Sequence, residues 1–131
     1  MLVIDASLAV ELSLHTPKGA HAAEIALQSG EELHAPHLID IEFAHALRRL
    51  VLSNEIEGAA GMQALQDFED LRLDRHPHSV FLPRIWELRN SVSAYDGAYI
   101  ALSEILHAPL LTCDGRLSRS HGHRAEIRII A

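Results

Sequence analysis

Short apolar segments alternate with longer amphipathic segments along this chain, and this alternation most constrains its fold. Leu2–Ile4 and Leu110–Cys113 are runs too short for helices, and an aspartate follows each of them directly. Apolar runs of this length are typical of strands buried on both faces of a parallel sheet. We therefore expect an α/β fold in which helices cover both faces of a parallel sheet.

The other elements are predicted from residue spacing and from cap residues. Three further strands are expected at Leu33–Ala35, Leu71–Arg75 and Ile127–Ile130. The second of these alternates leucine with charged residues, which is typical of an exposed sheet edge. Helices are expected at Ala6–Leu14, Lys18–Ser29, Pro36–Ser53 and Glu55–Asp70, from Pro77 or Ser79 to about Asn90, and at Ser93–His107. The last helix is apolar around most of its circumference, so we expect it to be buried.

Composition restricts the classes of function and the compartment. The 131 residues include 18 acids and 11 bases, and this net charge of −7 argues against a broad non-specific DNA-binding surface. No charge-free stretch approaches the ~20 apolar residues of a membrane span, and we expect no secretory signal. Cys113 is the only cysteine and is predicted to be a buried strand thiol. We expect one domain over residues 1–131, located in a reducing cytoplasm.

Four carboxylates are candidates for a shared site. Asp5 and Asp114 follow predicted strands, and ligands of open parallel sheets bind beyond the carboxyl ends of the strands. Asp96 lies in the first turn of the buried helix, and Glu42 lies at the margin of an apolar helix stripe. Converging carboxylates repel each other unless protons or a hard cation lie among them. Mg²⁺ and Mn²⁺ prefer oxygen ligands, so this pattern is compatible with metal-assisted phosphate chemistry.

Each of these acids also has a purely structural interpretation. Asp5 suits the N-cap of the following helix, and Asp96 suits the acid of a capping box that begins at Ser93. Asp114 suits the first position of a type I turn, and Glu42 can reach solvent from a helix surface. Taken one at a time, the structural interpretations are favoured, and spacing alone is only a weak indication of a site.

Four segments together resemble the PIN-domain ribonucleases, specifically the VapC toxins of prokaryotic toxin–antitoxin pairs. They are Val3–Ser7, Pro36–Arg49, Tyr95–Leu102 and Pro109–Leu117, and each contains one of the four acids. Their order, spacing and total length match that family over the whole chain. The resemblance implies a three-layer α/β/α sandwich with a parallel sheet of roughly five strands. It also implies an endoribonuclease that depends on Mg²⁺ or Mn²⁺.

The resemblance assigns roles to individual residues and partners. It gives the catalytic and metal-binding role to Asp5, Glu42, Asp96 and Asp114. It gives the hydroxyls of Ser7 and Thr112 the task of orienting those carboxylates. His45 and Gly97 stand where the family often has Asn and Ala, and neither difference removes a metal ligand. The implied partners are an RNA substrate, a cognate VapB-like antitoxin and a second copy of the chain, with Leu50–Leu52 as a candidate dimer contact.

The paired histidines need a separate interpretation. Three pairs have metal-like spacing: His34 and His37, His76 and His78, His121 and His123. None has a third histidine or a cysteine at structural-zinc spacing, so we interpret them as solvated. For His121, His123 and Arg124, the alternative that they contact RNA phosphates stays open.

Receiver domains, dehalogenase-type phosphatases and dinucleotide binders do not fit the sequence. The only lysine is Lys18, Ser7 replaces the second aspartate of an Asp-x-Asp motif, and no glycine precedes Gly19. The alternative that stays open is a catalytically inactive PIN fold that binds RNA or protein. A nuclease assay with and without Mg²⁺ separates this alternative from the ribonuclease.

Overall fold

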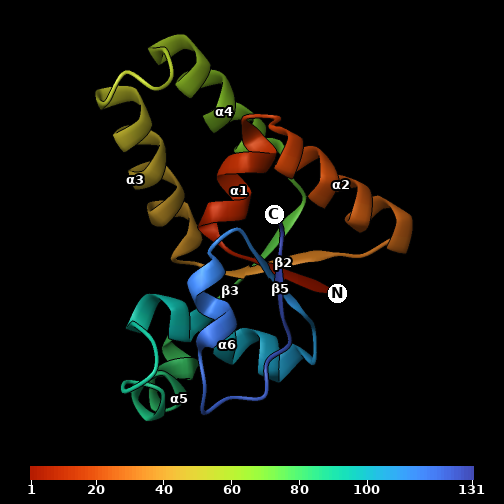
Figure 1. Ribbon diagram of the computed structural model, residues 1–131, viewed down its shortest axis with the longest axis vertical. Helices are drawn as coiled ribbons and strands as arrows, with labels where there is room; N and C mark the ends of the chain where they lie inside the picture. The colour runs from red at the N-terminus through yellow and green to blue at the C-terminus, as the bar shows by residue number, and fades with distance from the viewer.

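The computed structural model describes residues 1–131, and a five-stranded parallel sheet forms its centre (Figure 1). The strands are β1 (Leu2–Ile4), β2 (Leu33–Pro36), β3 (Leu73–His76), β4 (Leu110–Thr112) and β5 (Ile127–Ile129). Their order in the sheet is β3-β2-β1-β4-β5. The chain therefore places β2 and β3 on one side of β1, and then places β4 and β5 on the other side. The predicted parallel α/β sheet is confirmed.

Helices form one layer on each face of the sheet (Figure 1). One layer contains α1 (Ala6–Ser13), α2 (Pro17–Ser29), α3 (Ile39–Leu52) and α4 (Gly58–Asp70). The other contains α5 (Leu82–Glu87) and α6 (Ala94–Leu106). Two short 3-10 helices, η1 (Ser79–Phe81) and η2 (Gly115–Arg119), complete the chain. No helix has the length and apolar character needed to cross a membrane.

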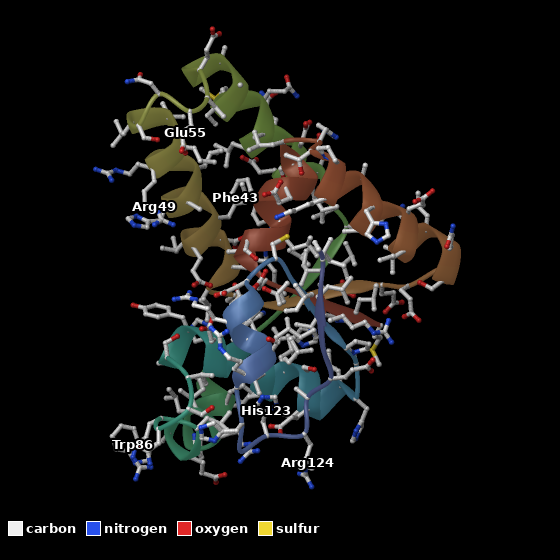
Figure 2. The ribbon with its side chains drawn as sticks, in the orientation of Figure 1. Phe43, Arg49, Glu55, Trp86, His123 and Arg124 are labelled. Carbon is white, nitrogen blue, oxygen red and sulfur yellow. The ribbon has the colours of Figure 1, made fainter.

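The core lies between the sheet and the two helix layers. Val3 and Ile4 of β1 are fully buried, as expected for a central strand covered on both faces. Residues 97–103 of α6 are all buried, which confirms the prediction from its apolar circumference. Phe43 of α3 points inward (Figure 2), and its ring stacks on Phe68 of α4 with centroids 4.0 Å apart. Burying a side chain of this kind stabilises the fold by about 1.5–3 kcal/mol, and this pair joins two helices of one layer.

Local signals explain where the first helices begin and how closely they pack. Thr16 accepts a hydrogen bond from the Gly19 amide at 3.1 Å, and Pro17 occupies the first turn of α2. A Cβ atom at Gly19 would lie 2.1 Å from the carbonyl oxygen of Glu11 in α1. The close approach of α1 and α2 therefore requires glycine at this position.

Two predicted helices differ in the structure, and each of the two segments contains a proline. Pro36 is the last residue of β2 rather than the first residue of a helix, and α3 begins only at Ile39. The segment predicted as one helix over residues 77–90 is divided into η1 and α5. Pro83 lies in the first turn of α5, where its missing amide is tolerated, whereas inside a continuous helix it would remove a hydrogen bond.

Two smaller differences concern α4 and Cys113. The helix α4 begins at Gly58 rather than at Glu55, because Asn54 adopts a left-handed conformation with φ of 60° that ends the preceding turn. Cys113 follows β4 and is half-buried rather than buried within the strand. The predicted edge position of the Leu71–Arg75 segment is confirmed, because β3 is an outer strand of the sheet.

Candidate active site at the carboxyl ends of the strands

The two central strands, β1 and β4, bring two of the predicted acids to one edge of the sheet. Asp5 directly follows β1, and Asp114 lies two residues after β4. The strands pair in parallel, with Ile4 opposite Leu111, so their carboxyl ends lie side by side. This is also the point where the strand order changes direction, which is the usual ligand position in an open α/β sheet.

Asp5 is a buried carboxylate held by three groups, two of which, Ser7 and Leu8, belong to the local fold. Its Oδ1 accepts hydrogen bonds from the Leu8 amide at 3.1 Å and from the Ser7 hydroxyl at 2.6 Å. Its Oδ2 accepts a hydrogen bond from the Thr112 hydroxyl. Burial raises the pKa of Asp5, the hydrogen bonds oppose that rise, and the charge of Asp96 adds to it. Asp5 is therefore the N-cap of α1, as predicted, and its carboxylate also accepts hydrogen bonds from Ser7 and Thr112.

Ser7 and Thr112 connect the ends of β1 and β4. Their hydroxyl oxygens lie 3.3 Å apart, and both donate to Asp5. The Cys113 amide donates to Ser7 Oγ at 3.1 Å, and the Asp114 amide donates to Thr112 Oγ1 at 3.0 Å. These bonds fix the orientation of Asp5 and the path of the chain that leads to Asp114.

Glu42 lies on α3 with its carboxylate turned toward the protein interior. Its Oε1 accepts a hydrogen bond from the Tyr99 hydroxyl of α6 at 2.6 Å. Partial burial raises the pKa of Glu42, the Tyr99 hydroxyl lowers it, and Asp96 and Asp5 raise it further. Glu42 is therefore half-buried beside the other acids, and the interpretation that it reaches freely into solvent is wrong.

Asp96 lies in the first turn of α6, where its backbone amide donates to Ser93 Oγ at 3.1 Å. Burial and the charge of Asp114 raise the pKa of Asp96, whereas Ser93 and Arg116 lower it. The helix N-terminus favours a negative charge at this position. The charge of Asp96 also raises the pKa values of Asp5 and Glu42.

Asp114 differs from the other three acids because a cation neutralises it. Arg116 forms a two-bond pair with it, with Nε 3.0 Å from Oδ1 and Nη2 2.8 Å from Oδ2. The Arg116 amide also donates to Oδ1 at 3.0 Å. The Arg116 hydrogen bond is the main cause that lowers the pKa of Asp114. Asp114 is therefore ionised in the folded protein, and the predicted turn role at this position is also present.

Together, the four carboxylates form an acidic group with more negative charge than its protein partners neutralise. The pKa values of Asp5, Glu42 and Asp96 are all raised, with burial as the largest cause and mutual repulsion adding to it. Such a group is stabilised by a hard cation, and its donor set contains only oxygen. The residues present therefore fit a Mg²⁺ or Mn²⁺ ion.

Two residues of this site were not assigned a role from the sequence. Tyr99 lies in the helix expected at Ser93–His107, and Arg116 lies in the segment Pro109–Leu117 that resembles the family, but neither was given a role of its own. The signal for Arg116 is its spacing of two residues from Asp114, which allows the guanidinium to return to the carboxylate. Tyr99 carries no comparable local signal, because its partner Glu42 is 57 residues away.

A groove of about 700 Å³ adjoins the acidic group between α1 and α3. Ser7, whose hydroxyl binds Asp5, is one of its lining residues. Arg48 and Arg49 of α3 also line it and are exposed, and Arg49 is labelled in Figure 2. They are two of the three bases within residues 1–66, and Glu11 and Glu55 line the same groove, so its positive charge comes from α3 alone.

The interpretation that the paired histidines are solvated is wrong for three of them, His34, His76 and His123. His34 is buried in β2, and its Nδ1 lies 2.8 Å from His76 Nε2. His123 is half-buried and uses both ring nitrogens, toward Ser120 Oγ at 2.7 Å and toward the Ala125 amide at 3.2 Å. His123 is therefore occupied within the protein, on the loop that precedes β5 rather than at the carboxyl ends of the strands (Figure 2).

A three-layer α/β/α fold with a five-stranded parallel sheet and acids at the carboxyl ends of its central strands is the arrangement expected of a PIN domain. The PIN domain family model matches residues 2–121, and the chain belongs to this family. Within it, the chain belongs to the VapC group. Ribonuclease VapC12 of Mycobacterium tuberculosis is 45% identical over 131 residues and 100% of both chains. Ribonuclease VapC9 of the same organism is 38% identical, covering 99% of this chain and 98% of the relative.

Solved structures agree with this assignment of the fold. VapBC2 from Rickettsia felis, crystallised with a DNA fragment from its promoter, contains a chain that superposes with a TM-score of 0.71 and 13% identity. That match covers 99% of this chain and 98% of the other. PAE2754 from Pyrobaculum aerophilum superposes with a TM-score of 0.67 and 22% identity, over 96% of this chain and 82% of the other. At these identities the likeness supports the fold.

Proposed function

We propose that this protein is a metal-dependent endoribonuclease that acts as the toxin of a type II toxin–antitoxin pair. The observation that carries the proposal is the convergence of Asp5, Glu42, Asp96 and Asp114 beside β1 and β4. The 45% identity to a ribonuclease over the full length of both chains supports RNA as the substrate class. The whole chain, residues 1–131, would act as a single PIN domain.

The four carboxylates are the groups that would hold Mg²⁺ or Mn²⁺. When bound, such an ion polarises a phosphate and lowers the pKa of a coordinated water. Asp5 supplies a carboxylate whose orientation is fixed by Ser7 and Thr112. Asp114 contributes its charge only in part, because Arg116 already pairs with it.

Other residues of the chain would position the substrate. Arg48 and Arg49 line the groove beside Ser7 and can form two-bond contacts with phosphate groups. Tyr99 holds Glu42 in one orientation at 2.6 Å. An RNA strand lying in this groove would pass the acidic group with its backbone charge neutralised on the α3 side.

The proposed partners follow from the acidic group and from the comparisons. A VapB-like antitoxin would neutralise the site by placing an Arg or Lys among Asp5, Asp96 and Asp114, with an apolar helix in a groove beside it. A homodimer is proposed through the end of α3, where Leu52 is exposed while Leu50 and Val51 are half-buried. Co-expression with the neighbouring genes tests the antitoxin, and light scattering of the purified chain tests the dimer. We propose a cytoplasmic location.

The decisive experiment pairs RNA cleavage with thermal unfolding in two variants, Asp5→Asn and Asp96→Asn. Both substitutions keep the size of the side chain and remove its charge. We expect each to lower the Mg²⁺-dependent cleavage rate by at least about 100-fold, because a metal site supplies several kcal/mol of transition-state stabilisation. Both variants should still fold cooperatively. Asp70→Asn, at an exposed carboxylate outside the site, is the matched control and should cleave like the wild type.

The open alternative is an inactive PIN fold that binds RNA or protein, and the same assay separates it. An inactive module would show no cleavage in Mg²⁺ or Mn²⁺ by the wild-type chain. Cleavage that persists in excess EDTA would contradict the metal-dependent proposal. Cleavage at the wild-type rate by either variant would remove that residue from the site.

A further inference from the structure

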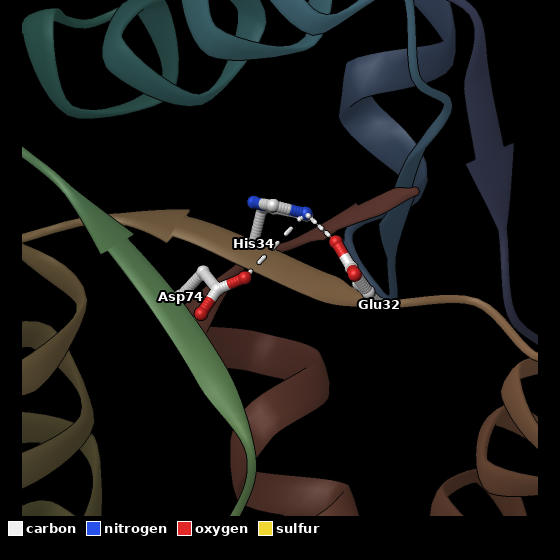
Figure 3. Close-up of side chains that lie close together, drawn as sticks. All are labelled: Glu32, His34 and Asp74. Carbon is white, nitrogen blue, oxygen red and sulfur yellow. Dashed lines mark ion pairs between the residues drawn. The ribbon is translucent and has the colours of Figure 1, made fainter.

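A second group of metal-binding side chains lies on β2 and β3, separate from the acidic group. Glu32 precedes β2, His34 is the second residue of β2, and Asp74 is the second residue of β3 (Figure 3). His34 pairs with Asp74 in the sheet register, and Glu32 lies two residues before His34. Alternate residues of a strand share a face, so the three side chains project from the same face of the sheet.

The position of this group separates it from the proposed nuclease site. Glu32, His34 and Asp74 lie toward the amino ends of their strands. Asp5 and Asp114 lie beyond the carboxyl ends of β1 and β4. An ion held by one group is therefore not shared with the other.

The central observation is an unpaired nitrogen of a buried histidine. Only 5% of the His34 surface is exposed, and its Nε2 atom is buried without a hydrogen-bond partner. This nitrogen faces the Glu32 carboxylate at 3.4 Å and the Asp74 carboxylate at 3.9 Å. Buried polar atoms are nearly always partnered, so an unpartnered one that faces two anions indicates a cation between them.

The other ring nitrogen of His34 is held as in metal-binding histidines. Nδ1 of His34 lies 2.8 Å from Nε2 of His76 on β3. When Nδ1 donates its proton to His76, the Nε2 lone pair of His34 points toward the two carboxylates. A hydrogen bond at the second nitrogen is what fixes the tautomer and ring orientation of most metal-ligating histidines.

We propose that Glu32, His34 and Asp74 bind one divalent cation of the zinc class. Ligand atoms about 2.0–2.2 Å from a tetrahedral zinc ion lie roughly 3.3 Å from each other. Here the three ligand atoms all lie within 4.8 Å of one another. The side chains of Glu32 and Asp74 are 71% and 66% exposed, so both carboxylates are free to close the remaining distance. A water molecule would complete the coordination.

The donor set decides between zinc and magnesium. An imidazole nitrogen is a good ligand for zinc and a poor one for Mg²⁺, which prefers oxygen. The two sites of this protein are thus expected to select different ions. A bound ion would also join the edge strand β3 to β2 through side chains, in addition to their backbone hydrogen bonds.

The test is a titration of the full chain carrying Asp5→Asn and Asp96→Asn, which weakens the acidic site. After treatment with a chelator, zinc chloride is added and followed by calorimetry and by thermal unfolding. We expect one zinc ion per chain and a rise in melting temperature, because a ligand that binds only the folded state stabilises it. Magnesium chloride at the same concentration should give no such rise.

Variants then locate the bound zinc. Glu32→Gln and Asp74→Asn change exposed side chains, so both should fold, and each should weaken zinc binding by at least about 10-fold. The controls Glu24→Gln and Asp70→Asn remove exposed carboxylates elsewhere and should leave the affinity unchanged. Failure to bind zinc would overturn the proposal, and so would binding that neither Glu32→Gln nor Asp74→Asn weakens. An imidazolium signal from His34 in NMR at neutral pH, without zinc uptake, would show that Nε2 carries a proton rather than a metal ion. That result would also overturn the proposal.

Discussion

Asp5 shows how one side chain serves both the local fold and the proposed chemistry. Its Oδ1 caps α1 through the Leu8 amide, while Ser7 and Thr112 bind the same carboxylate. The capping interpretation and the site interpretation are therefore both correct for this residue. Because the cap needs only one acceptor oxygen, Asn can retain it, whereas the negative charge is lost.

The Tyr99 hydroxyl gives a prediction at the residue scale. Tyr99→Phe keeps the buried ring and removes the hydrogen bond to Glu42. We expect the RNA cleavage rate to fall about 10-fold, which corresponds to ~1.4 kcal/mol, because Glu42 loses its fixed orientation. The stability should fall by about 1 kcal/mol. Cleavage assays and urea unfolding measure the two effects.

Tyr95→Phe is the control for this prediction, because Tyr95 lies on the same helix and is 64% exposed. It should change neither the cleavage rate nor the stability. Equal effects of the two substitutions would contradict the positioning role of Tyr99.

The site residues differ in how readily the sequence predicts them. Asp5 and Asp114 are predictable because each follows a short apolar strand, and the positions of strand ends are set by local pattern. Glu42 was only a weak candidate from its margin position on a helix, which is compatible with solvent exposure, and the family resemblance was needed to give it a role. Tyr99 and His34 could not be assigned, since each role depends on a partner that only the folded sheet brings close.

At the scale of elements, the sheet and the buried helix were predicted well and the proline-containing segments were not. The alternation of apolar and amphipathic segments was sufficient for β1, β4 and α6. Pro36 is compatible both with a helix start and with a strand end, and in the structure it is the buried last residue of β2, opposite His76 of β3. Pro83 divides the segment before α6 because it has no backbone amide to donate within a continuous helix. The spacing of apolar residues does not show this.

The Arg84–Glu104 pair gives a prediction about how α5 is attached to α6. The two side chains form two hydrogen bonds at 2.8 and 2.9 Å, and Glu104 also accepts from the Arg124 amide at 2.9 Å. We expect Glu104→Gln to lower the free energy of unfolding by about 1–3 kcal/mol at neutral pH. Urea unfolding as a function of pH measures this difference.

The pH dependence of that effect has a definite sign. Arg84 lowers the pKa of Glu104 below its ordinary value of 4.5. Its contribution to stability is therefore present above that value and is lost as the pH falls through the lower pKa of the folded state. The difference between wild type and Glu104→Gln should shrink in acid. Glu126→Gln removes an exposed partner of Arg128 and should cost less than about 1 kcal/mol at any pH.

The arginines of α3 give a second prediction at this scale. Arg48→Ala and Arg49→Ala should each weaken RNA binding and reduce the salt dependence of the binding constant by about one phosphate contact. The measurement is RNA affinity across a range of salt concentrations, using the Asp5→Asn background to prevent cleavage. Arg128→Ala, on the edge strand β5, should leave the salt dependence unchanged. An unchanged slope in both α3 variants would exclude the groove as the RNA path.

For the whole molecule, the acidic group makes stability depend on pH and on the divalent ion. The raised pKa values of Asp5, Glu42 and Asp96 mean that the folded state binds more protons than the unfolded state above the ordinary values of 3.8 and 4.5. These groups therefore lower the stability as the pH rises through their folded-state pKa values. We expect this loss in EDTA and its reversal by Mg²⁺.

The measurement is the melting temperature over a pH series that starts near the ordinary carboxyl pKa values of 3.8 and 4.5 and rises through neutral pH, in EDTA and in Mg²⁺. Taking the difference between wild type and the Asp5→Asn, Asp96→Asn double variant removes the contribution of the histidines. In EDTA, the melting temperature of the double variant should increase relative to that of the wild type as the pH rises. A difference that does not change with pH would show that these acids do not carry the expected repulsion.

The pairing of β1 with β4 also determines when the site can come into existence. Asp5 and Thr112, which share a hydrogen bond, are separated by 107 positions along the chain. Contacts between such distant positions form late and slowly in folding. During synthesis, a ribosome-bound chain has Asp5 long before it has Thr112 or Asp114. The proposed active site can therefore form only after the chain has been synthesised beyond Asp114 and β4 has paired with β1.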